Sequence, residues 1–287
     1  MTLSTKTEDE KLVWFRSDPE QKMMFQGGRF TRVNKFCSLL LAVIGTVLFF
    51  LILIPLHSTY FAAMFTQRGA VPYVIVLFFN WSISILALKA SKLRLQRAAL
   101  KCPLIPSNPE FVLSPSTVGE VTKRMYEFVD EPRQFLLFNR IDIALSNLRN
   151  LGRVSDLDEI LRSQGVQDES IVESSYSLIN AFVWAIPVLG FIGTVQGLSL
   201  SIGGFGAVLA KTQELSEIKS SLQNVTGGLS VAFETTLQGL IAALVVQLVL
   251  SFVKSKEEEF LDDCSEYCVR NIVGRLRLTP FEMDSAS

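Results

Sequence analysis

The chain has 287 residues, 27 of them basic and 28 acidic, and its formal net charge is −1. This balance argues against a general nucleic-acid-binding protein, which needs a clustered basic surface. A single histidine excludes multi-histidine metal sites, and four cysteines without regular spacing do not form a disulfide framework. We therefore expect no cofactor, no bound metal and no nucleic-acid partner.

Charged residues are missing from four long stretches of the chain. Residues 36–56, 69–88 and 178–210 contain none, and residues 229–253 contain only Glu234. Each stretch is long enough to cross a bilayer, because an apolar helix needs about 20 residues to span about 30 Å of hydrocarbon. Four helices buried in a soluble core would need more amphipathic sequence to cover them than this chain has. The sequence therefore predicts an all-α polytopic membrane protein with four transmembrane helices.

The charged flanks predict how these helices are oriented. The first stretch starts only at residue 36, behind a charged segment, and no small-residue cleavage site follows its apolar core, so we expect the first span to remain as an anchor. The short connection 57–68 carries only Arg68, and the connection 211–228 carries two Lys and two Glu, so both are expected outside, whereas basic residues cluster on the remaining flanks. Those residues are Arg29, Arg32, Lys35, Lys89, Lys92, Arg94, Arg97, Lys101, Lys254 and Lys256. By the positive-inside bias, both chain ends and residues 89–177 lie in the cytoplasm of an inner-membrane protein.

Residues 89–177 read as a helical cytoplasmic domain without a strand pattern. The second span is expected to continue to Lys101 and to end before Pro103. Thr117 and Glu120 fit a capping box that opens a helix over residues 118–129. Apolar residues at positions 135, 138, 141, 145 and 148 then follow helical spacing and predict a helix over 135–150.

Two further helical segments flank the last pair of spans. An acidic helix from Asp156 is expected to break at Gly165, and a new one from Asp168 to continue into the third span. Residues 254–287 are expected to form a cytoplasmic helix and a tail. Cys264 and Cys268 lie one turn apart there, but no third ligand is near, so unpaired thiols are favoured over a metal site.

The third span, within the segment 178–253, carries a stripe of small and mildly polar residues. The stripe has a spacing of three and four, which places its members on one helix face. Its members are Pro187, Gly190, Thr194, Gly197 and Ser201. Such a stripe suits either close helix contact or a narrow wet pore, and Gly193 with Gly197 would let a neighbouring backbone approach.

The fourth span carries matching stripes. Gly228, Ala232, Thr235, Gly239 and Ala242 form one stripe, and Thr236 lies on a second stripe beside it. The alternative for each isolated threonine is a hydrogen bond to the carbonyl one turn earlier. The spans contain no paired carboxylates, histidine or Ser/Lys dyad, so we do not expect an enzyme.

The last two spans together resemble the MotA/TolQ/ExbB proton-channel family, over about residues 175–255. In the third span the resemblance rests on Pro187-Val188-Leu189-Gly190, Gly193-Thr194-Val195 and Gly197-Leu198. In the fourth span it rests on Ala232-Phe233, Thr235-Thr236 and Gly239-Leu240. The two motifs stand in order on adjacent spans, which makes the resemblance fairly specific.

The resemblance implies a pore-forming large subunit of a proton-driven motor. Family members form homopentamers whose last two helices per subunit line a pore, and two copies of a single-span MotB-, TolR- or ExbD-like partner occupy it. The partner contributes the proton-accepting Asp, and ion flow is coupled to mechanical work in motility or envelope transport. Thr194 and Thr236 match the pore threonines, and Pro187 matches a proline of flagellar stator subunits. Gly190, Gly193, Gly197 and Gly239 would pack the helices at the pore.

The fourth span also departs from the family pattern. Val231 stands where many transporter-type members carry an acid, and Glu234 lies two residues before Thr236. That separation is about 200° around a helix, so both cannot face one axis. Glu234, with Thr235, is a candidate for the ion pathway; alternatively it makes a subunit-interface hydrogen bond with Ser230 or Gln238. A non-conducting oligomeric scaffold is the rival function.

Overall fold

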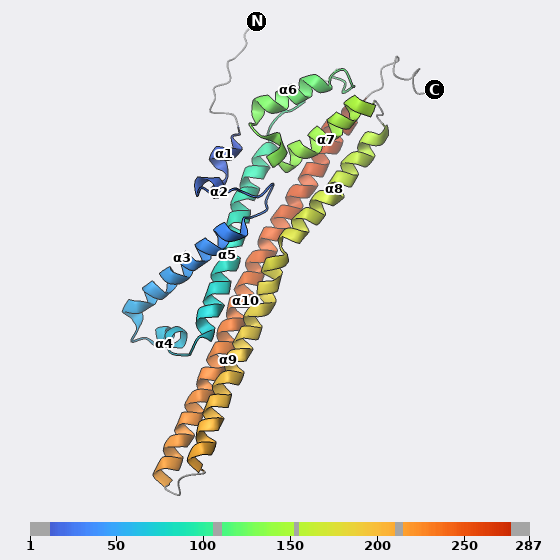
Figure 1. Ribbon diagram of the computed structural model, residues 1–287. Coiled ribbons are helices and arrows are strands. Elements are labelled where there is room, and N and C mark those ends of the chain that lie inside the picture. The colour runs from blue at the N-terminus through green and yellow to red at the C-terminus, as the bar shows by residue number, and fades with distance from the viewer. Residues whose placement is uncertain (1–11, 106–110, 152–154, 210–214, 277–287) are drawn as a thin grey trace. The chain divides into compact units, whose positions relative to one another are not determined.

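The computed structural model describes residues 12–105, 111–151, 155–209 and 215–276 (Figure 1). Parts of the predicted N-terminal segment and most of the predicted C-terminal tail thus lie outside the described residues. Within them the fold is built of helices, and β structure is limited to isolated bridges from Leu12 to Val129 and from Leu113 to Leu276. The all-α prediction is confirmed.

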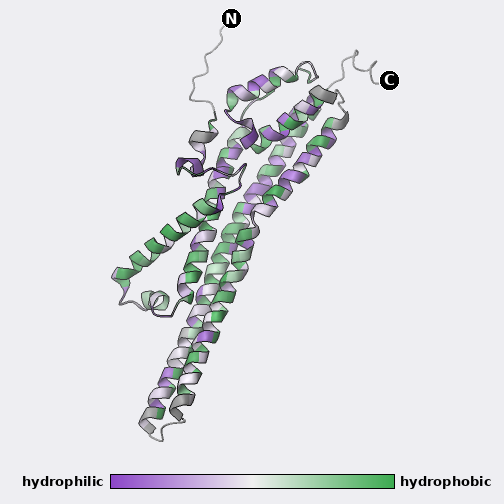
Figure 2. Ribbon diagram, in the orientation of Figure 1, coloured by the Kyte–Doolittle hydropathy of each residue, from purple (hydrophilic) through white to green (hydrophobic). Residues whose placement is uncertain are grey.

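Four helices are long and apolar enough to cross a membrane, which confirms the predicted number of spans. The first is α3 (Lys35–Leu53), continued by a 3₁₀ turn over Ile54–Leu56, and the second is α5 (Val71–Ala99). The third and fourth are α9 (Ser177–Leu209) and α10 (Leu215–Asn271). Figure 2 shows α3 as almost uniformly hydrophobic, as expected of a helix that faces lipid.

The contacts within the chain divide it into two units. The membrane unit comprises Lys35–Leu86 and Tyr176–Phe252, and the polar unit comprises the rest of the chain. Helices α5 and α10 contribute residues to both units.

The membrane unit contains a short helix that the sequence did not reveal. Helix α4 (Tyr60–Thr66) lies in the connection between the first two spans. The side chain of Thr59 caps it by accepting a hydrogen bond from the backbone N–H of Ala62, at 3.3 Å. On the first two spans, the indole N–H of Trp81 donates to the hydroxyl of Ser38 at 3.1 Å, which joins α3 to α5.

The polar unit packs an aromatic and aliphatic core. Its helices are α1 (Trp14–Ser17), α2 (Pro19–Lys22), α6 (Val118–Phe128), α7 (Leu136–Leu151) and α8 (Ser155–Ser175), with short 3₁₀ turns at Pro132–Gln134 and Val273–Arg275. The five apolar positions that predicted α7 are all buried: Phe135, Phe138, Ile141, Leu145 and Leu148. Trp14 meets Phe135 edge-on, with ring centroids 5.3 Å apart. The apolar positions from which the helix was predicted therefore form part of the core of the polar unit.

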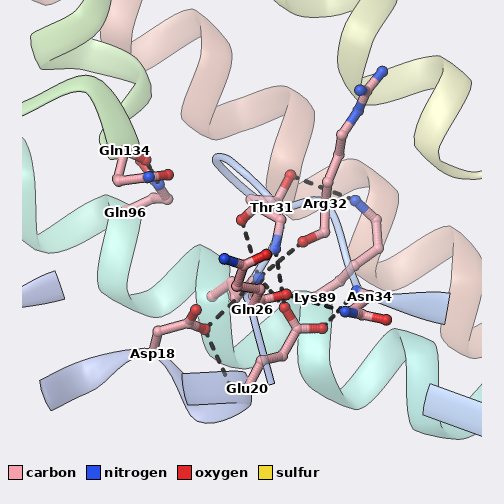
Figure 3. A network of polar contacts seen from close by, with 11 residues as sticks. Asp18, Glu20, Gln26, Thr31, Arg32, Asn34, Lys89, Gln96 and Gln134 are labelled. Atoms are coloured by element: carbon pink, nitrogen blue, oxygen red, sulfur yellow. Dashed lines mark hydrogen bonds and ion pairs between the residues drawn. The ribbon is translucent and has the colours of Figure 1, made fainter. Parts of the chain in front are cut away.

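Buried ion pairs cross this core at three places. Lys89 on α5 meets Glu257 on α10 at 3.1 Å, and Arg140 on α7 meets Asp168 on α8 at 2.9 Å. Lys92, buried on α5, meets Glu20 at 2.5 Å and Asp18 at 3.7 Å. Figure 3 shows the polar network around Asp18 and Glu20 of the N-terminal segment. All of these side chains are almost completely buried, so each charge depends on its partner.

Two local predictions were wrong in detail. Thr117 precedes α6 as expected, but its hydroxyl accepts from the backbone N–H of Ser114 at 2.9 Å instead of forming a capping box. Helix α8 runs through Gly165 without a break. A glycine costs a helix about 1 kcal/mol, and the buried pair of Arg140 with Asp168, three residues after Gly165, anchors α8 on α7.

The fourth helix begins well before the fourth apolar stretch. That stretch starts at residue 229, yet α10 begins at Leu215 and includes the polar residues between. The appearance of charge marks where the apolar stretch ends and does not mark where the helix ends. Residues 210–214 lie outside the described part of the chain.

Candidate functional site

The predicted site lies where α9 and α10 approach each other through glycines. A Cβ atom added at Gly190 would lie 2.9 Å from the carbonyl oxygen of Thr235 and 3.1 Å from the Cα of Thr236. One added at Gly239 would lie 2.9 Å from the carbonyl oxygen of Ile186. Real Cβ atoms essentially never lie closer than 3.0 Å to a backbone atom of another helix turn, so a side chain at either position would force the backbones apart. The two glycines therefore permit a helix contact that any other residue would open.

This close approach brings Thr194 and Thr236 together. Their hydroxyl oxygens are in direct hydrogen-bonding contact. The hydroxyl of Thr194 also lies 2.9 Å from the carbonyl oxygen of Ala232 on α10. The back-bond to the carbonyl one turn earlier, which was the alternative for an isolated threonine, is present as well, at 3.3 Å from Gly190. Both side chains are half-buried. The two matched threonines thus form one hydroxyl pair between the two helices.

The carbonyl oxygen of Gly190 is the common acceptor at this site. The hydroxyls of Thr194, Thr235 and Thr236 lie 3.3 Å, 3.4 Å and 3.2 Å from it. A carbonyl oxygen has two lone pairs and each hydroxyl has one proton to donate. Within α9 this oxygen also accepts the backbone N–H one turn later. The three hydroxyls therefore cannot all donate to it at once, and each has another oxygen within reach toward which it can rotate its proton.

Thr235 differs from the other two threonines because it is only 1% exposed. Its hydroxyl donates to the carbonyl of Ala232 at 2.9 Å. A Cβ added at Gly193 would lie 2.7 Å from that hydroxyl oxygen, so the glycine makes room for it. Gly197 is less constrained, because a Cβ there would meet Ala232 at an ordinary 3.4 Å. Thr235 and Gly193 thus form a dry helix contact.

Pro187 lies inside α9 and lines an apolar groove between α9 and α10. The side chain of Trp184 at this groove is 79% exposed within the chain. The groove is lined by Val183, Trp184, Pro187, Val188, Phe191, Ala243, Leu244 and Gln247. Such an apolar surface suits lipid or another membrane helix.

Glu234 belongs to a different cluster. Its carboxylate accepts from Nε of Arg68 at 2.8 Å and from the hydroxyl of Tyr60 at 2.6 Å. The hydroxyl of Ser230, one of the two partners named from the sequence, lies 3.3 Å away within the same chain. The other named partner, Gln238, donates instead to the backbone carbonyl of Met64 at 2.8 Å. The structure therefore brings Glu234 to the connection between the first two spans.

Sequence reasoning missed Arg68 and Tyr60 as partners of Glu234. One signal was available: Arg68 is the only charged residue of the connection 57–68, and Glu234 is the only charged residue of the fourth span. A charge within a membrane span needs a partner, and the partner is usually another charged residue. The register of the pair could not be read from the sequence.

The described residues contain no group of three or more side chains that could hold a metal ion. Cys264 and Cys268, in the part of α10 that belongs to the polar unit, are both buried free thiols. Burial raises the pKa of Cys268 to about 11 and that of Cys264 further. High pKa values keep both thiols protonated and unreactive near neutral pH.

Comparison with known protein families gives a match over the second half of the chain. Residues 136–266 match the model of the MotA/TolQ/ExbB proton channel family. The match includes both helices of the site and extends to α7 and α8, well before the segment that carries the motifs. No curated protein and no solved structure matches the chain.

Proposed function

We propose that this chain, whose residues 136–266 match the MotA/TolQ/ExbB proton channel family, is the pore-forming large subunit of a proton-driven motor. The observation that carries the proposal is the hydroxyl pair of Thr194 and Thr236 at the glycine contact of α9 and α10. Hydroxyls can orient water or bind a carboxylate, but they do not take up a proton near neutral pH.

The proton acceptor would come from a partner. No carboxylate contacts the hydroxyl pair among the bonds of the described residues, and Glu234 is engaged with Arg68. A single-span partner of the MotB, TolR or ExbD type would bring an Asp to the threonines. Thr194 would then shape the binding site of that carboxylate, and Thr236 would extend the polar path one level along the pore.

The proposed assembly is a homopentamer around two copies of the partner. Large apolar side chains of α9 and α10 are exposed in the single chain and are available for lipid or neighbouring subunits; they include Phe191, Val195, Phe233, Leu240 and Leu244. The basic flanks favour a cytoplasmic location of both chain ends in an inner-membrane protein. Ion flow would be coupled to mechanical work on a domain of the partner outside that membrane.

The test is a proton-leak measurement on cells that express the chain with and without the single-span protein of the adjacent reading frame. We expect a leak only with both proteins present, and a loss of about tenfold or more in Thr194→Val and Thr236→Val. A suitable control is Thr226→Val, because the exposed Thr226 hydroxyl donates to backbone carbonyls of its own helix. Unchanged flux in both variants would remove the threonines from the mechanism.

The mass of the purified complex in detergent tests the assembly. Five copies of the chain with two partner copies would agree with the proposal. A large oligomer that never binds the partner and never conducts would instead favour the scaffold.

A further inference from the structure

The only charged residue of the fourth span has its charged and aromatic partners in the connection between the first two spans. Arg68 approaches the carboxylate of Glu234 with two nitrogens, Nε at 2.8 Å from Oε2 and Nη2 at 3.3 Å from Oε1. The hydroxyl of Tyr60 donates to Oε1 at 2.6 Å. Glu234 is only 7% exposed, so this carboxylate has exchanged water for side-chain donors.

A second contact lies one turn further along α10. The amide of Gln238 donates to the backbone carbonyl of Met64 at 2.8 Å, and Gln238 is itself buried. Met64 belongs to α4, which starts at Tyr60. The connection is therefore attached to the same face of α10 at two levels, by Glu234 and by Gln238.

The pairing also determines what Glu234 can do. A carboxylate removed from water is costly to ionise without a partner, and a two-pronged guanidinium contact is the strongest compensation available from a side chain. The ionised pair has no net charge. Thr236 lies about 200° around α10 from Glu234 and contacts α9. The ion pair of Glu234 with Arg68 and the hydroxyl pair of Thr236 with Thr194 therefore occupy different faces of α10.

We infer that Glu234, Arg68 and Tyr60 form a clamp that fixes the connection between the first two spans on α10 and keeps the charge of the fourth span out of the ion path. Glu234 is then a positioning residue and does not carry protons. The statement that Glu234 carries no protons rests on the proposed function. The attachment of the connection to α10 does not, because it is a property of the folded chain.

Limited proteolysis of the purified full-length protein in detergent tests the clamp without any ion flow. Arg68 is the single trypsin site between residues 57 and 70, and cleavage there creates a new N-terminus at Gly69. Because proteases cut segments that open locally, we expect Glu234→Gln to accelerate this cleavage about tenfold. Leu237→Ala is the matched control, because Leu237 lies on an exposed face of α10. Equal cleavage rates in wild type and Glu234→Gln would overturn the clamp.

Charge reversal separates a clamp from a proton carrier. Arg68→Glu and Glu234→Arg should each lower the amount of assembled complex several-fold, and the double variant should restore it together with at least half of the flux. If Glu234 carried protons, the double variant would assemble and not conduct, which would overturn the inference. Absence of flux in the wild-type complex would count against the proposed function alone, since the cleavage assay does not depend on it.

Discussion

The polar unit and the contact of α9 with α10 in the membrane unit handle buried polar groups in opposite ways. In the polar unit, long charged side chains meet across the core, as in the pairs of Lys89 with Glu257 and Arg140 with Asp168. In the membrane unit, the contact of α9 and α10 depends on side chains that are absent, at Gly190 and Gly239, and on short hydroxyls. The polar unit should therefore be damaged by removing atoms, and the contact of α9 with α10 by adding them.

The largest effect is expected from removing a buried charge in the polar unit. Lys92→Met would leave the carboxylates of Glu20 and Asp18 without their ammonium partner. Breaking a buried ion pair on one side costs about 3–5 kcal/mol. We expect a loss of this size in the free energy of unfolding of the polar unit, measured by denaturant titration. Lys123→Met at an exposed position of α6 should stay within about 0.5 kcal/mol of wild type, and equal effects would contradict the comparison.

The next effect comes from adding one carbon atom in the membrane unit. Gly190→Ala would place Cβ 2.9 Å from the Thr235 carbonyl oxygen and push α9 away from α10. Overpacking of this kind costs about 1–3 kcal/mol, which a lower thermal midpoint of the detergent-solubilised complex would reveal. Gly203→Ala is the matched control on the same helix, because nothing lies within 4 Å of its added Cβ. A lower midpoint in Gly203→Ala as well would mean that helical glycines matter here for another reason.

The pH dependence of the polar unit should reveal the carboxyl group of Asp18. Burial raises its pKa, and the nearby ammonium of Lys92 opposes this only in part. A carboxyl whose pKa is higher in the folded state contributes most when protonated. Its contribution therefore declines as the pH rises from the unfolded-state pKa through the folded-state pKa. We expect wild type to lose stability relative to Asp18→Asn over this interval, in paired denaturant titrations from acidic pH upward, and parallel curves would contradict the assignment.

The last expected effect concerns the alkylation rate of the buried cysteine thiols and leaves the folded structure unchanged. Because burial raises the pKa of Cys268 to about 11, alkylation at mildly alkaline pH should be about a hundredfold slower than for an exposed thiol. Mass spectrometry after a pulse of iodoacetamide would measure this for each cysteine. Labelling of Cys264 and Cys268 should become fast in denaturant, and rapid labelling in the native complex would show that the polar unit opens readily.

The features that sequence could predict are those with a local or periodic signal. The four spans follow from the absence of charge over about 20 residues, because a soluble chain of this size could not bury four such helices. The close approach of α9 and α10 follows from small-residue stripes on adjacent spans, because such stripes let the two backbones come together, whereas the direct contact of Thr194 with Thr236 was not predicted. Helix α7 follows from its apolar period.

The features that escaped prediction depend on contacts between distant residues. Arg68 and Glu234 are 166 positions apart, and no local pattern records their pairing. Lys89 and Lys92 entered the sequence argument as markers of orientation, yet the structure buries both in ion pairs. Helix α4 is too short to be stable without its attachments to α10. In each case tertiary contact outweighs the local preference of the chain.

The Gly190 carbonyl has a consequence for how such a site can be studied. The oxygen shared by Thr194, Thr235 and Thr236 belongs to the main chain. Every amino acid has this atom, so no ordinary substitution at position 190 removes it. Alanine scanning would remove the donors one by one, and one of the remaining hydroxyls could donate in place of the one removed. An ester in place of the amide between Gly190 and Phe191 weakens the carbonyl oxygen as an acceptor and leaves all side chains intact. This replacement would test the shared acceptor directly.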